Sequence, residues 1–504
     1  SWNPVKESGY DGDIVAHMGP GVKVIKEIKP ISVNEQSEGT YIFDLGQNIS
    51  GFARMNVTGD ANTVVKLRFG EMLQNDGSLY TANLRSAAAT DYYTLKGDPN
   101  GETWQPRFTF HGFRYIEVTG YPGVPAVDDI TGVAISSLQN TTGSFTTSNE
   151  DINQLQSNIT WGQLDNFISV PTDCPQRDER LGYTGDSQVF VRTAAMNQDV
   201  QRFFQKFMMD VTTNQRADGA IADWTPNYVT PGDGLSGSFG ASGWGDGVII
   251  IPWTMYTTYG DTAIIRQSYE GMKGWIRYYQ NLETKDHLVE GCGNNYGDWL
   301  SVGANTPIDL ICTGYYAYSC DLLSKMAEAI GETEDAAAYR NLFEQIKEGF
   351  NKAFVDEEGH VGNGTQTSYL MALKFNLLKD DEARKKAAAY LVEDIKNKNW
   401  HLSTGFMGVA YLCPMLTEMG YADVAYRLLL QDTYPSWLYS VRAGATTIWE
   451  RWNSYDYETG QFGDVGMNSF NHYSLGSVGE WFYNYVAGIS YDEENPGYKH
   501  FYLK

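Results

Sequence analysis

The chain has 504 residues, more than one hydrophobic core usually holds, so its length predicts several domains. Asp and Glu outnumber Lys and Arg by 62 to 37, and the resulting net charge of −25 opposes binding to nucleic acid or to an anionic membrane surface. No run of 18 apolar residues is present, so no membrane-spanning helix is predicted. A neutral or cationic ligand fits this charge better.

Aromatic residues make up 14% of the chain, with 34 Tyr and 13 Trp. Aromatic rings stack on the C–H faces of sugars, but large rings also fill a large core, so composition leaves both interpretations open. The five cysteines show no CxxC pair or Cys/His cluster; they are Cys174, Cys292, Cys312, Cys320 and Cys413. Neither a disulfide framework nor a zinc site is expected, and the cellular compartment stays open.

Residues 1–143 are predicted to form an antiparallel β-sandwich domain. Short runs rich in β-branched and aromatic residues alternate here with turn clusters such as "TGDAN", "QNDGS" and "KGDPNGE". The expected strands are "YIFDL", "FARMNV", "VVKLRF", "DYYTL" and "FRYIEV". Strands at this spacing are typical of a sandwich of antiparallel sheets.

Residues 144–487 change from strand to helix periodicity. Ser148 or Asn149 is suited to cap a first helix, in which Ile152, Leu155 and Ile159 follow at helical spacing. About a dozen helices are expected from the apolar stripes, joined alternately by short and long links. This arrangement suits a closed (α/α)6 toroid. An open helical solenoid would give a similar pattern, but no repeat of about 34 or 40 residues is visible.

Three long Gly- and aromatic-rich segments between the predicted helices are expected to carry the chemistry, since such long loops tend to be functional. The first holds Trp224 and the pair Trp244 and Asp246 in "GWGDG"; the others hold Trp299 and His472. An Asp beside a Trp can hold two sugar hydroxyls while the indole covers the ring face. Each one alone is more often core packing or a helix cap, but their recurrence in three separate long loops favours a carbohydrate site.

Residues 171–186, "PTDCPQRDERLGYTGD", concentrate charge in a stretch too broken to be one helix. They are expected to form a partly exposed loop before a helix that begins near Ser187. Crowded carboxylates raise one another's pKa and neighbouring arginines lower it, which sorts carboxyls into acid and base roles. A solvated loop of surface ion pairs is the alternative, although the interleaved Gly, Pro and Cys argue against it. The charged residues are Asp173, Arg177, Asp178, Glu179, Arg180 and Asp186.

A second candidate carboxylate, Glu450, stands between Trp449 and Trp452 in "GATTIWERWNSYD". Aromatic surface removes water from a carboxylate and makes it more basic, as a general base near neutral pH requires. The alternative is a structural ion pair with Arg451 or Arg442. Spacing alone does not decide between the two.

No metal site and no cofactor are predicted. The seven His are scattered without an HxxxH or HExxH pattern, and no EF-hand pattern is present. The chain also lacks GxxxxGK[ST], a GxGxxG after a strand and a GxSxG elbow.

These motifs resemble those of the bacterial α-L-rhamnosidases of glycoside hydrolase family 78. "DCPQRDERLGYTGD" is similar to the family's signature and "GATTIWERW" to its second one, with "GWGDG", "GDWL" and "TYPSWLYSV" in the family's order. Earlier segments, among them "FDLGQNISGFARMNV" and "FTFHGFRYIEVTGY", resemble the family's β-sandwich. The resemblance covers essentially the whole chain. It implies that lectin-like modules are missing before the sandwich and that residues 488–504 begin a C-terminal β-domain that is cut off.

The resemblance implies hydrolysis of a terminal α-L-rhamnose with inversion, with Glu179 as general acid and Glu450 as general base about 6.5–9.5 Å apart. The ligand would be a rhamnose-containing glycoside or polysaccharide. Family sugar-holding residues fall on Asp173, Arg177, Tyr183, Asp186, Trp244, Asp246, Trp299 and His472. Where the family commonly has Trp, this chain has Tyr183, so the neighbouring subsite is expected to differ.

Two alternatives stay open. One is another (α/α)6 carbohydrate-active enzyme, such as a lyase, which would need cations to neutralise the carboxylate of its substrate. The other is a sugar-binding protein without turnover. The sequence does not indicate the oligomeric state.

Overall fold

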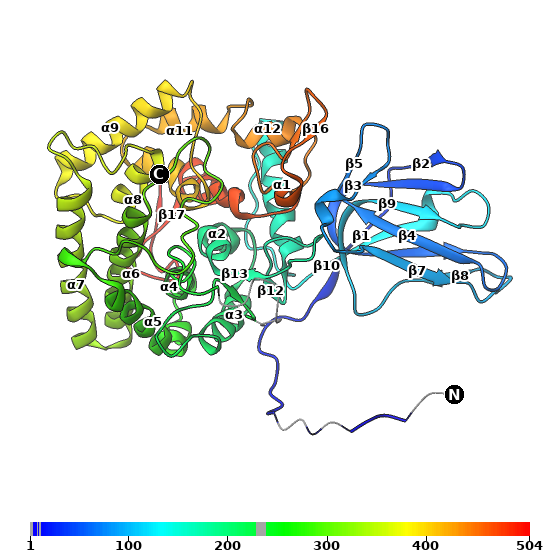
Figure 1. The fold of residues 1–504 in the computed structure, drawn as a ribbon, viewed down its shortest axis with the longest axis horizontal. Helices are drawn as coiled ribbons and strands as arrows, with labels where there is room; N and C mark the ends of the chain where they lie inside the picture. Colours follow the sequence, from blue (N-terminus) through cyan, green and yellow to red (C-terminus); the bar gives the residue numbers. More distant parts are fainter. Residues whose placement is uncertain (1–3, 8, 10–11, 228–237) are drawn as a thin grey trace.

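The computed structural model describes residues 4–7, 9, 12–227 and 238–504, and it consists of a strand-rich part followed by a helical part. Figure 1 shows the strands in blue at one end of the molecule and the helices, from green to red, at the other. An antiparallel β-domain followed by a helical toroid is the order that the sequence predicts, and this fold is confirmed.

The main sheet of the β-domain is antiparallel, with the strand order β1-β10-β3-β9-β4-β7, and β2 and β8 extend it along β3. The short strands β5 (Met72–Leu73) and β6 (Leu79–Tyr80) pair separately. Alternate side chains of these strands point into one core that includes Phe43, Met55, Phe69 and Phe113. The strands are β1 (Lys23–Ile28), β2 (Ser32–Ser37), β3 (Thr40–Val57), β4 (Val64–Gly70), β7 (Thr90–Thr94), β8 (Glu102–Trp104), β9 (His111–Thr119) and β10 (Ile130–Ser136).

Two strands that the sequence predicts separately, "YIFDL" and "FARMNV", are parts of the single 18-residue strand β3. Its first half pairs with β2 and β9, and its end pairs with β10 and β8. The pairing shifts after Asp44, where Gly46 has a φ of 71° and its N–H donates to Asp44 Oδ1 at 2.7 Å. This bulge brings Gln47 to the helical domain, where its Nε2 donates to the Thr446 carbonyl at 2.9 Å.

The inner helices of the second part form a ring that closes on itself. Each inner helix contacts the next, and the 3₁₀ segment η5 returns to α2. The ring is therefore the closed (α/α)6 toroid rather than an open solenoid. Its inner elements are α2 (Thr184–Asn197), α4 (Gly247–Tyr259), α6 (Ile308–Ile330), α8 (Gln366–Lys374), α10 (Phe406–Glu418) and η5 (Ser474–Val478), which continues into α13 (Gly479–Trp481) and η6 (Phe482–Val486).

The outer helices alternate with the inner ones along the chain, except that α11 and α12 follow one another before η5. Helix α1 begins after Asn149, whose side chain accepts hydrogen bonds from the N–H groups of Asp151 and Ile152, so Asn149 is the cap that is used. After the ring, the short strands β17 (Ile489–Tyr491) and β18 (Phe501–Leu503) pair with each other. The outer helices are α1 (Glu150–Asn166), α3 (Gln201–Thr213), α5 (Ala263–Leu282), α7 (Thr333–Phe354), α9 (Asp381–Asn397), α11 (Ala422–Leu429) and α12 (Trp437–Arg442).

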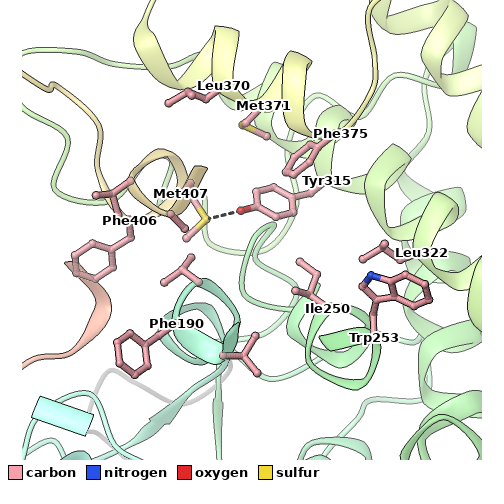
Figure 2. Packing of buried hydrophobic residues seen from close by; sticks show 14 of the residues in the cluster. Phe190, Ile250, Trp253, Tyr315, Leu322, Leu370, Met371, Phe375, Phe406 and Met407 are labelled. Carbon is pink, nitrogen blue, oxygen red and sulfur yellow. Dashed lines mark hydrogen bonds between the residues drawn. The ribbon is translucent and has the colours of Figure 1, made fainter. Parts of the chain in front are cut away.

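The centre of the ring is an apolar core, in which Ile250, Tyr315, Met371 and Met407 pack together from four inner helices (Figure 2). The Tyr315 hydroxyl donates to Met407 Sδ at 3.2 Å. The run "GVIIIPW" lies in α4, which is apolar all round because ring and outer helices both cover it. Among the described helices, none combines the length and apolar character that crossing a membrane requires.

Candidate active site

A cavity of about 220 Å³ lies where the inner helices begin. Tyr183 precedes α2, Trp244 stands shortly before α4, Phe406 begins α10 and His472 precedes η5, and all four line the cavity. The ring thus gathers loops that are far apart in the sequence. Sequence-predicted residues that line it are Asp173, Arg177, Glu179, Tyr183, Asp186, Trp244, Trp299, Glu450 and His472.

The charged stretch 171–186 is mostly buried, and residues 178–180 at its tip are the partly exposed part that the sequence predicts. Two hydrogen bonds join Asp173 and Leu181 across the base of the loop. The Asp173 N–H donates to the Leu181 carbonyl and the Leu181 N–H donates to Asp173 Oδ1, both at 3.0 Å. Asp173 and Arg177 are only 2% and 3% exposed. Helix α2 begins at Thr184, so Asp186 lies in its first turn rather than in the loop.

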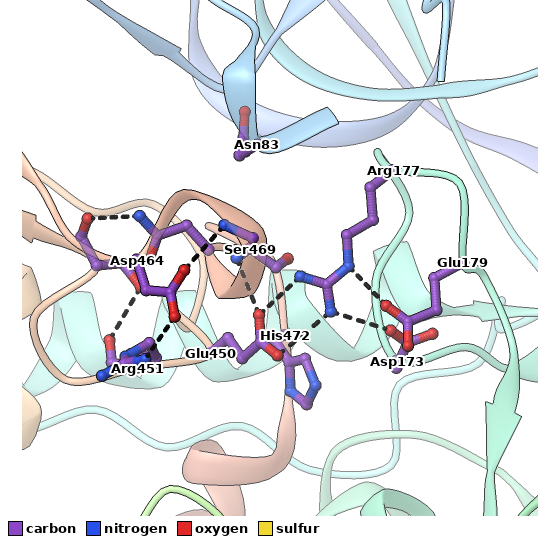
Figure 3. Close-up of polar contacts among 12 residues, drawn as sticks. Asn83, Asp173, Arg177, Glu179, Glu450, Arg451, Asp464, Ser469 and His472 are labelled. Atoms are coloured by element: carbon purple, nitrogen blue, oxygen red, sulfur yellow. Dashed lines mark hydrogen bonds and ion pairs between the residues drawn. The ribbon is translucent and has the colours of Figure 1, made fainter. Parts of the chain in front are cut away.

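Arg177 lies between the two glutamates that the sequence predicts as acid and base (Figure 3). Its Nε donates to Glu179 Oε2 at 2.7 Å, and its Nη1 and Nη2 donate to the two oxygens of Glu450 at 2.9 and 3.2 Å. Asp173 Oδ2 lies 3.5 Å from Nη2 on the same guanidinium. One arginine therefore orients three carboxylates that come from two distant segments.

The ion pair expected as the alternative for Glu450 does not form with the neighbouring arginines. Arg451 lies 3.8 Å from Asp464, and Arg442 pairs with Asp151 at 2.9 Å. Both of these pairs are partly exposed, whereas the Glu450 side chain is buried.

The Glu450 carboxylate is held by few protein groups. Oε2 accepts from the Ser469 N–H at 3.1 Å as well as from Arg177, whereas Oε1 accepts only from Arg177 among the described residues. Because a carboxylate oxygen can accept two hydrogen bonds, Oε1 can receive a further donor such as water. Burial raises the pKa of Glu450, although the Arg177 charge opposes this.

Glu179 is in more solvated surroundings than Glu450, with 16% of its side chain exposed compared with 3%. Its Oε1 accepts from the Tyr183 hydroxyl at 2.9 Å. Its Oε2 accepts from Arg177 and, at 3.1 Å, from Arg85 of the β-domain. The two carboxylates therefore share one guanidinium but differ in burial and in their other hydrogen-bond donors.

Two buried polar atoms of the cavity wall lack hydrogen-bond partners among the described residues: Asp173 Oδ2 and His472 Nδ1. His472 Nε2 lies 3.2 Å from Asp186 Oδ1, which also accepts from the Ser474 hydroxyl at 2.8 Å. Burial lowers the pKa of His472 to about 3 and raises that of Asp186 to about 7. A neutral imidazole that donates from Nε2 presents Nδ1 as an acceptor, so both unpartnered atoms can accept from ligand hydroxyls.

Asp246 differs from the expectation that it holds a sugar. Its buried carboxylate accepts from the Gly243 N–H at 2.7 Å, Trp275 Nε1 at 2.9 Å, the Tyr279 hydroxyl at 2.9 Å and the Ser319 hydroxyl at 2.6 Å. These bonds satisfy the carboxylate within the ring, and Asp246 is not among the residues that line the cavity. Its place is behind the wall, where it fixes the loop that carries the neighbouring tryptophan.

Asp298 supports Trp299 in the same way. Its oxygens accept from the Thr367 hydroxyl and from the N–H groups of Gly405 and Met407, at 2.5, 2.7 and 2.8 Å. It thus binds orphan N–H groups where α10 begins, as a capping side chain does. The Asp beside each Trp in these loops builds the wall, while the Trp itself faces the cavity.

An aromatic wall borders the carboxylates. Trp244 and Tyr296 have ring centroids 4.5 Å apart, Tyr296 and Trp299 are 5.9 Å apart, and Tyr183 and Trp224 are 5.3 Å apart. Tyr296 was not predicted, although it stands in the same aromatic loop as Trp299 and could have been found there.

Four further lining residues escaped the sequence reasoning, and one of them is Ser238. Phe406 and Met467 are apolar residues without any distinguishing pattern. Arg85 lies 94 residues before Glu179, in a β-domain segment that carries no chemical motif. No signal in the sequence connects it with the cavity.

Alternate residues of the loop segment 177–180 face opposite sides. Arg177 and Glu179 line the cavity, while Asp178 and Arg180 contact the β-domain. Asp178 Oδ2 accepts from the Ser86 hydroxyl and, at 3.2 Å, from the Ser86 N–H. The Arg180 guanidinium donates to the Phe110 carbonyl at 3.0 Å and lies 4.5 Å from the centre of its ring. Asp178, which had no role at the level of sequence, therefore docks the loop on the β-domain.

The ligand atoms of Asp173, Cys174 and Glu179 lie within 4.8 Å of one another, a spacing that a metal ion could use. Arg177 contacts both of these carboxylates, so a protein cation already balances their charge.

The comparisons with known proteins agree on one family. Residues 140–486 match the model of the bacterial alpha-L-rhamnosidase 6 hairpin glycosidase domain, and residues 34–136 match that of the bacterial alpha-L-rhamnosidase concanavalin-like domain. The chain is 47% identical over 494 residues to an alpha-L-rhamnosidase of Streptomyces avermitilis and 43% identical over 479 residues to one of Formosa agariphila. These alignments cover 97% and 93% of this chain but 46% and 50% of the relatives, so the chain spans about half of their length.

Solved structures give the same result. The S. avermitilis alpha-L-rhamnosidase complexed with L-rhamnose superimposes with a TM-score of 0.90 at 47% identity, covering 96% of this chain and 46% of that one. The Aspergillus terreus enzyme superimposes with a TM-score of 0.87 at 33% identity, covering 94% and 55%. With a family model matched across most of its length, the chain belongs to the bacterial α-L-rhamnosidases of the six-hairpin glycosidase type.

Proposed function

We propose that the protein hydrolyses terminal α-L-rhamnosides with inversion at the anomeric carbon, with Glu179 as general acid and Glu450 as general base. The observation that carries the proposal is the shared guanidinium of Arg177, which holds both carboxylates on one cavity. The division of roles, with Glu179 as acid and Glu450 as base, rests on the resemblance of their two motifs to the signatures of the family. The relatives named alpha-L-rhamnosidase, and the one solved with L-rhamnose, support L-rhamnose as the sugar of the proposed substrate.

The cavity suits a small neutral sugar. Asp173 Oδ2 and His472 Nδ1 can accept from its hydroxyls, and Trp244 and Trp299 can cover its apolar face. A lyase acting on uronic acids would need an unpaired cation for the substrate carboxylate. Both arginines that line the described part of the cavity, Arg85 and Arg177, are already paired with carboxylates.

In the proposed reaction, protonated Glu179 gives its proton to the glycosidic oxygen as the bond from this oxygen to the anomeric carbon breaks. A water on the opposite face attacks that carbon and gives a proton to Glu450. The turnover leaves Glu179 ionised and Glu450 protonated, and proton exchange with solvent restores both. Room for the water requires the two carboxyl groups to be about 6.5–9.5 Å apart.

Proton NMR of the first product tests activity, sugar and stereochemistry together. With an α-L-rhamnoside as substrate, we expect β-L-rhamnose to appear first and the α-anomer to grow in by mutarotation. Initial release of α-L-rhamnose would indicate a retaining mechanism and contradict the acid and base roles. Saturable binding of L-rhamnose without any hydrolysis would instead indicate a sugar-binding protein.

A further inference from the structure

We infer that Arg85, from the β-domain, is a positioning residue for the proton-donating carboxyl of Glu179, so that the β-domain is a working part of the active site. The inference rests on the proposed function, in which Glu179 is the acid. It adds a residue and a role that come from a different domain.

The hydrogen bonds of the Arg85 guanidinium go to residues of the helical domain. Its Nη1 donates to Glu179 Oε2 at 3.1 Å, while its Nε and Nη2 donate to the Gly466 carbonyl at 3.0 and 2.8 Å. Gly466 precedes Met467, which lines the cavity. The guanidinium thus links the β-domain to the Glu179 loop and to the segment that follows Glu450 in the chain.

The backbone is held so that this side chain reaches the cavity. Arg85 follows the 3₁₀ turn η1 (Ala82–Leu84) with a φ of 55° and ψ of −118°, a conformation that a residue other than glycine adopts at a cost. The next residue, Ser86, is fixed by its two hydrogen bonds to Asp178, the neighbour of Glu179. Such local strain persists only where surrounding contacts enforce it, and here those contacts belong to the catalytic loop.

The position of Arg85 determines which oxygen of Glu179 can carry the proton. Arg85 and Arg177 both donate to Oε2, and a protonated oxygen would place its hydrogen against those donors. The proton therefore resides on Oε1, next to the Tyr183 hydroxyl. Because a hydroxyl can either donate or accept, Tyr183 fits both protonation states of the acid.

Charge near Glu179 comes from both domains. Arg85 and Arg177 place two guanidinium groups against its Oε2. Carboxyls of Asp173 and Glu450 contact the same Arg177 guanidinium. Removing Arg85 therefore leaves Glu179 with one arginine contact, on a guanidinium that two other carboxyls share.

The test compares two leaving groups in the full chain. For Arg85→Gln we expect kcat to fall about 10-fold to 100-fold for a rhamnoside of an ordinary alcohol, which needs the acid, and less than about 3-fold for 2,4-dinitrophenyl α-L-rhamnoside, which does not. The contrast between the two substrates is the readout, because a merely structural role of Arg85 would slow both substrates alike.

Arg85→Lys and Asn75→Ala serve as matched variants. Lysine keeps the charge but loses the planar fork that binds Glu179 and the Gly466 carbonyl together, so the alcohol substrate should still slow. Asn75 also donates across the domains, to the Gly460 carbonyl at 3.3 Å, but does not line the cavity, so Asn75→Ala should leave both substrates unchanged.

Equal losses on both substrates would overturn the positioning role and leave Arg85 as a link between domains. If the unaltered protein hydrolysed neither substrate, the proposed function itself would fail, and this inference would fail with it. Thermal unfolding of each variant shows whether a loss comes from misfolding.

Discussion

Glu179 and Glu450 contact the same guanidinium, but only Glu450 is fully withdrawn from water. At the residue scale, the proposed roles of Glu179 as acid and Glu450 as base predict different responses to the leaving group. We expect Glu179→Gln to lower kcat by about 10²–10⁴-fold for alcohol leaving groups but far less for 2,4-dinitrophenolate, which departs without a proton. Glu450→Gln should slow both substrates, because water must be activated whichever group leaves.

Steady-state kinetics with the two substrates measures this contrast, and retained binding of L-rhamnose by calorimetry shows that a variant is folded. A Glu179→Gln enzyme that slows equally on both substrates would remove Glu179 from the acid role. Near-normal turnover by Glu450→Gln would remove Glu450 from the base role.

Sequence reasoning at this scale worked where chemistry leaves a local pattern. The stretch around Glu179 and the Trp-flanked Glu450 stand out as motifs, and the fold brings both to one cavity. Asp246 shows the limit, because an Asp beside a Trp looks the same whether it faces a sugar or four protein donors. Arg85 shows another limit of prediction from sequence, since its partner Glu179 lies in a different domain.

At the element scale, close packing of α2 against the Trp244 loop positions the aromatic wall. A Cβ at Gly185, in the first turn of α2, would lie 2.6 Å from the Trp244 ring. Gly185→Ala should therefore displace the indole and raise KM for the rhamnoside several-fold. Gly162→Ala in α1 is the control, because its Cβ would meet only ordinary contacts at 3.8 Å or more. Similar KM values for both variants would show that Trp244 does not shape the sugar site.

The segment 469–472 is held by a buried carboxylate of the β-domain, and this predicts a pH-dependent stability. Glu71 Oε2 accepts from the Phe470 N–H at 3.2 Å and from Asn83 at 3.1 Å, and burial raises the Glu71 pKa from 4.5 to about 7. The folded state therefore keeps a proton that the unfolded state releases between pH 4.5 and about 7, so the free energy of unfolding falls as pH rises through this window, by at most about 1.4 kcal/mol per unit.

Urea unfolding at pH 5, 6, 7 and 8 measures this slope. Glu71→Gln should reduce it, because the amide does not titrate, while Asp186, whose pKa burial also raises to about 7, keeps part of the slope. Glu27→Gln, at a carboxyl with 52% of its side chain exposed, serves as the control and should leave the slope unchanged. An equal slope in all three proteins would show that Glu71 does not titrate on unfolding.

Element prediction succeeded for the periodic segments and failed at two kinds of boundary. Helix α1 begins at one of its two predicted caps, because Asn149 carries the capping signal itself. The merger of two strands into β3 depends on a bulge at Gly46 and on pairing with β9, which lies more than 60 residues away along the chain. The burial of the loop 171–186 depends on the β-domain that covers it, and no local pattern records this.

At the scale of the whole molecule, the two domains are joined through buried polar groups rather than through apolar contact alone. Asp165, at the end of α1, accepts from the Ser50 N–H of β3 at 2.8 Å and from Asn471 at 2.8 Å. Asn48 of the β3 bulge donates to Thr447 at 3.2 Å, three residues before Glu450. Such groups are satisfied only while both domains are docked, so undocking would leave buried donors without acceptors.

We therefore expect calorimetry of the full chain to give one cooperative transition. Asp165→Ala removes the acceptor of two buried donors, each worth about 1–3 kcal/mol when left unsatisfied, and should separate the β-domain as an earlier transition. Asp151→Ala, in the same helix but paired on the surface with Arg442, should keep a single transition. Two transitions in the unaltered protein would mean that the domains unfold independently, and the polar contacts between them would then contribute little to the stability of the active site.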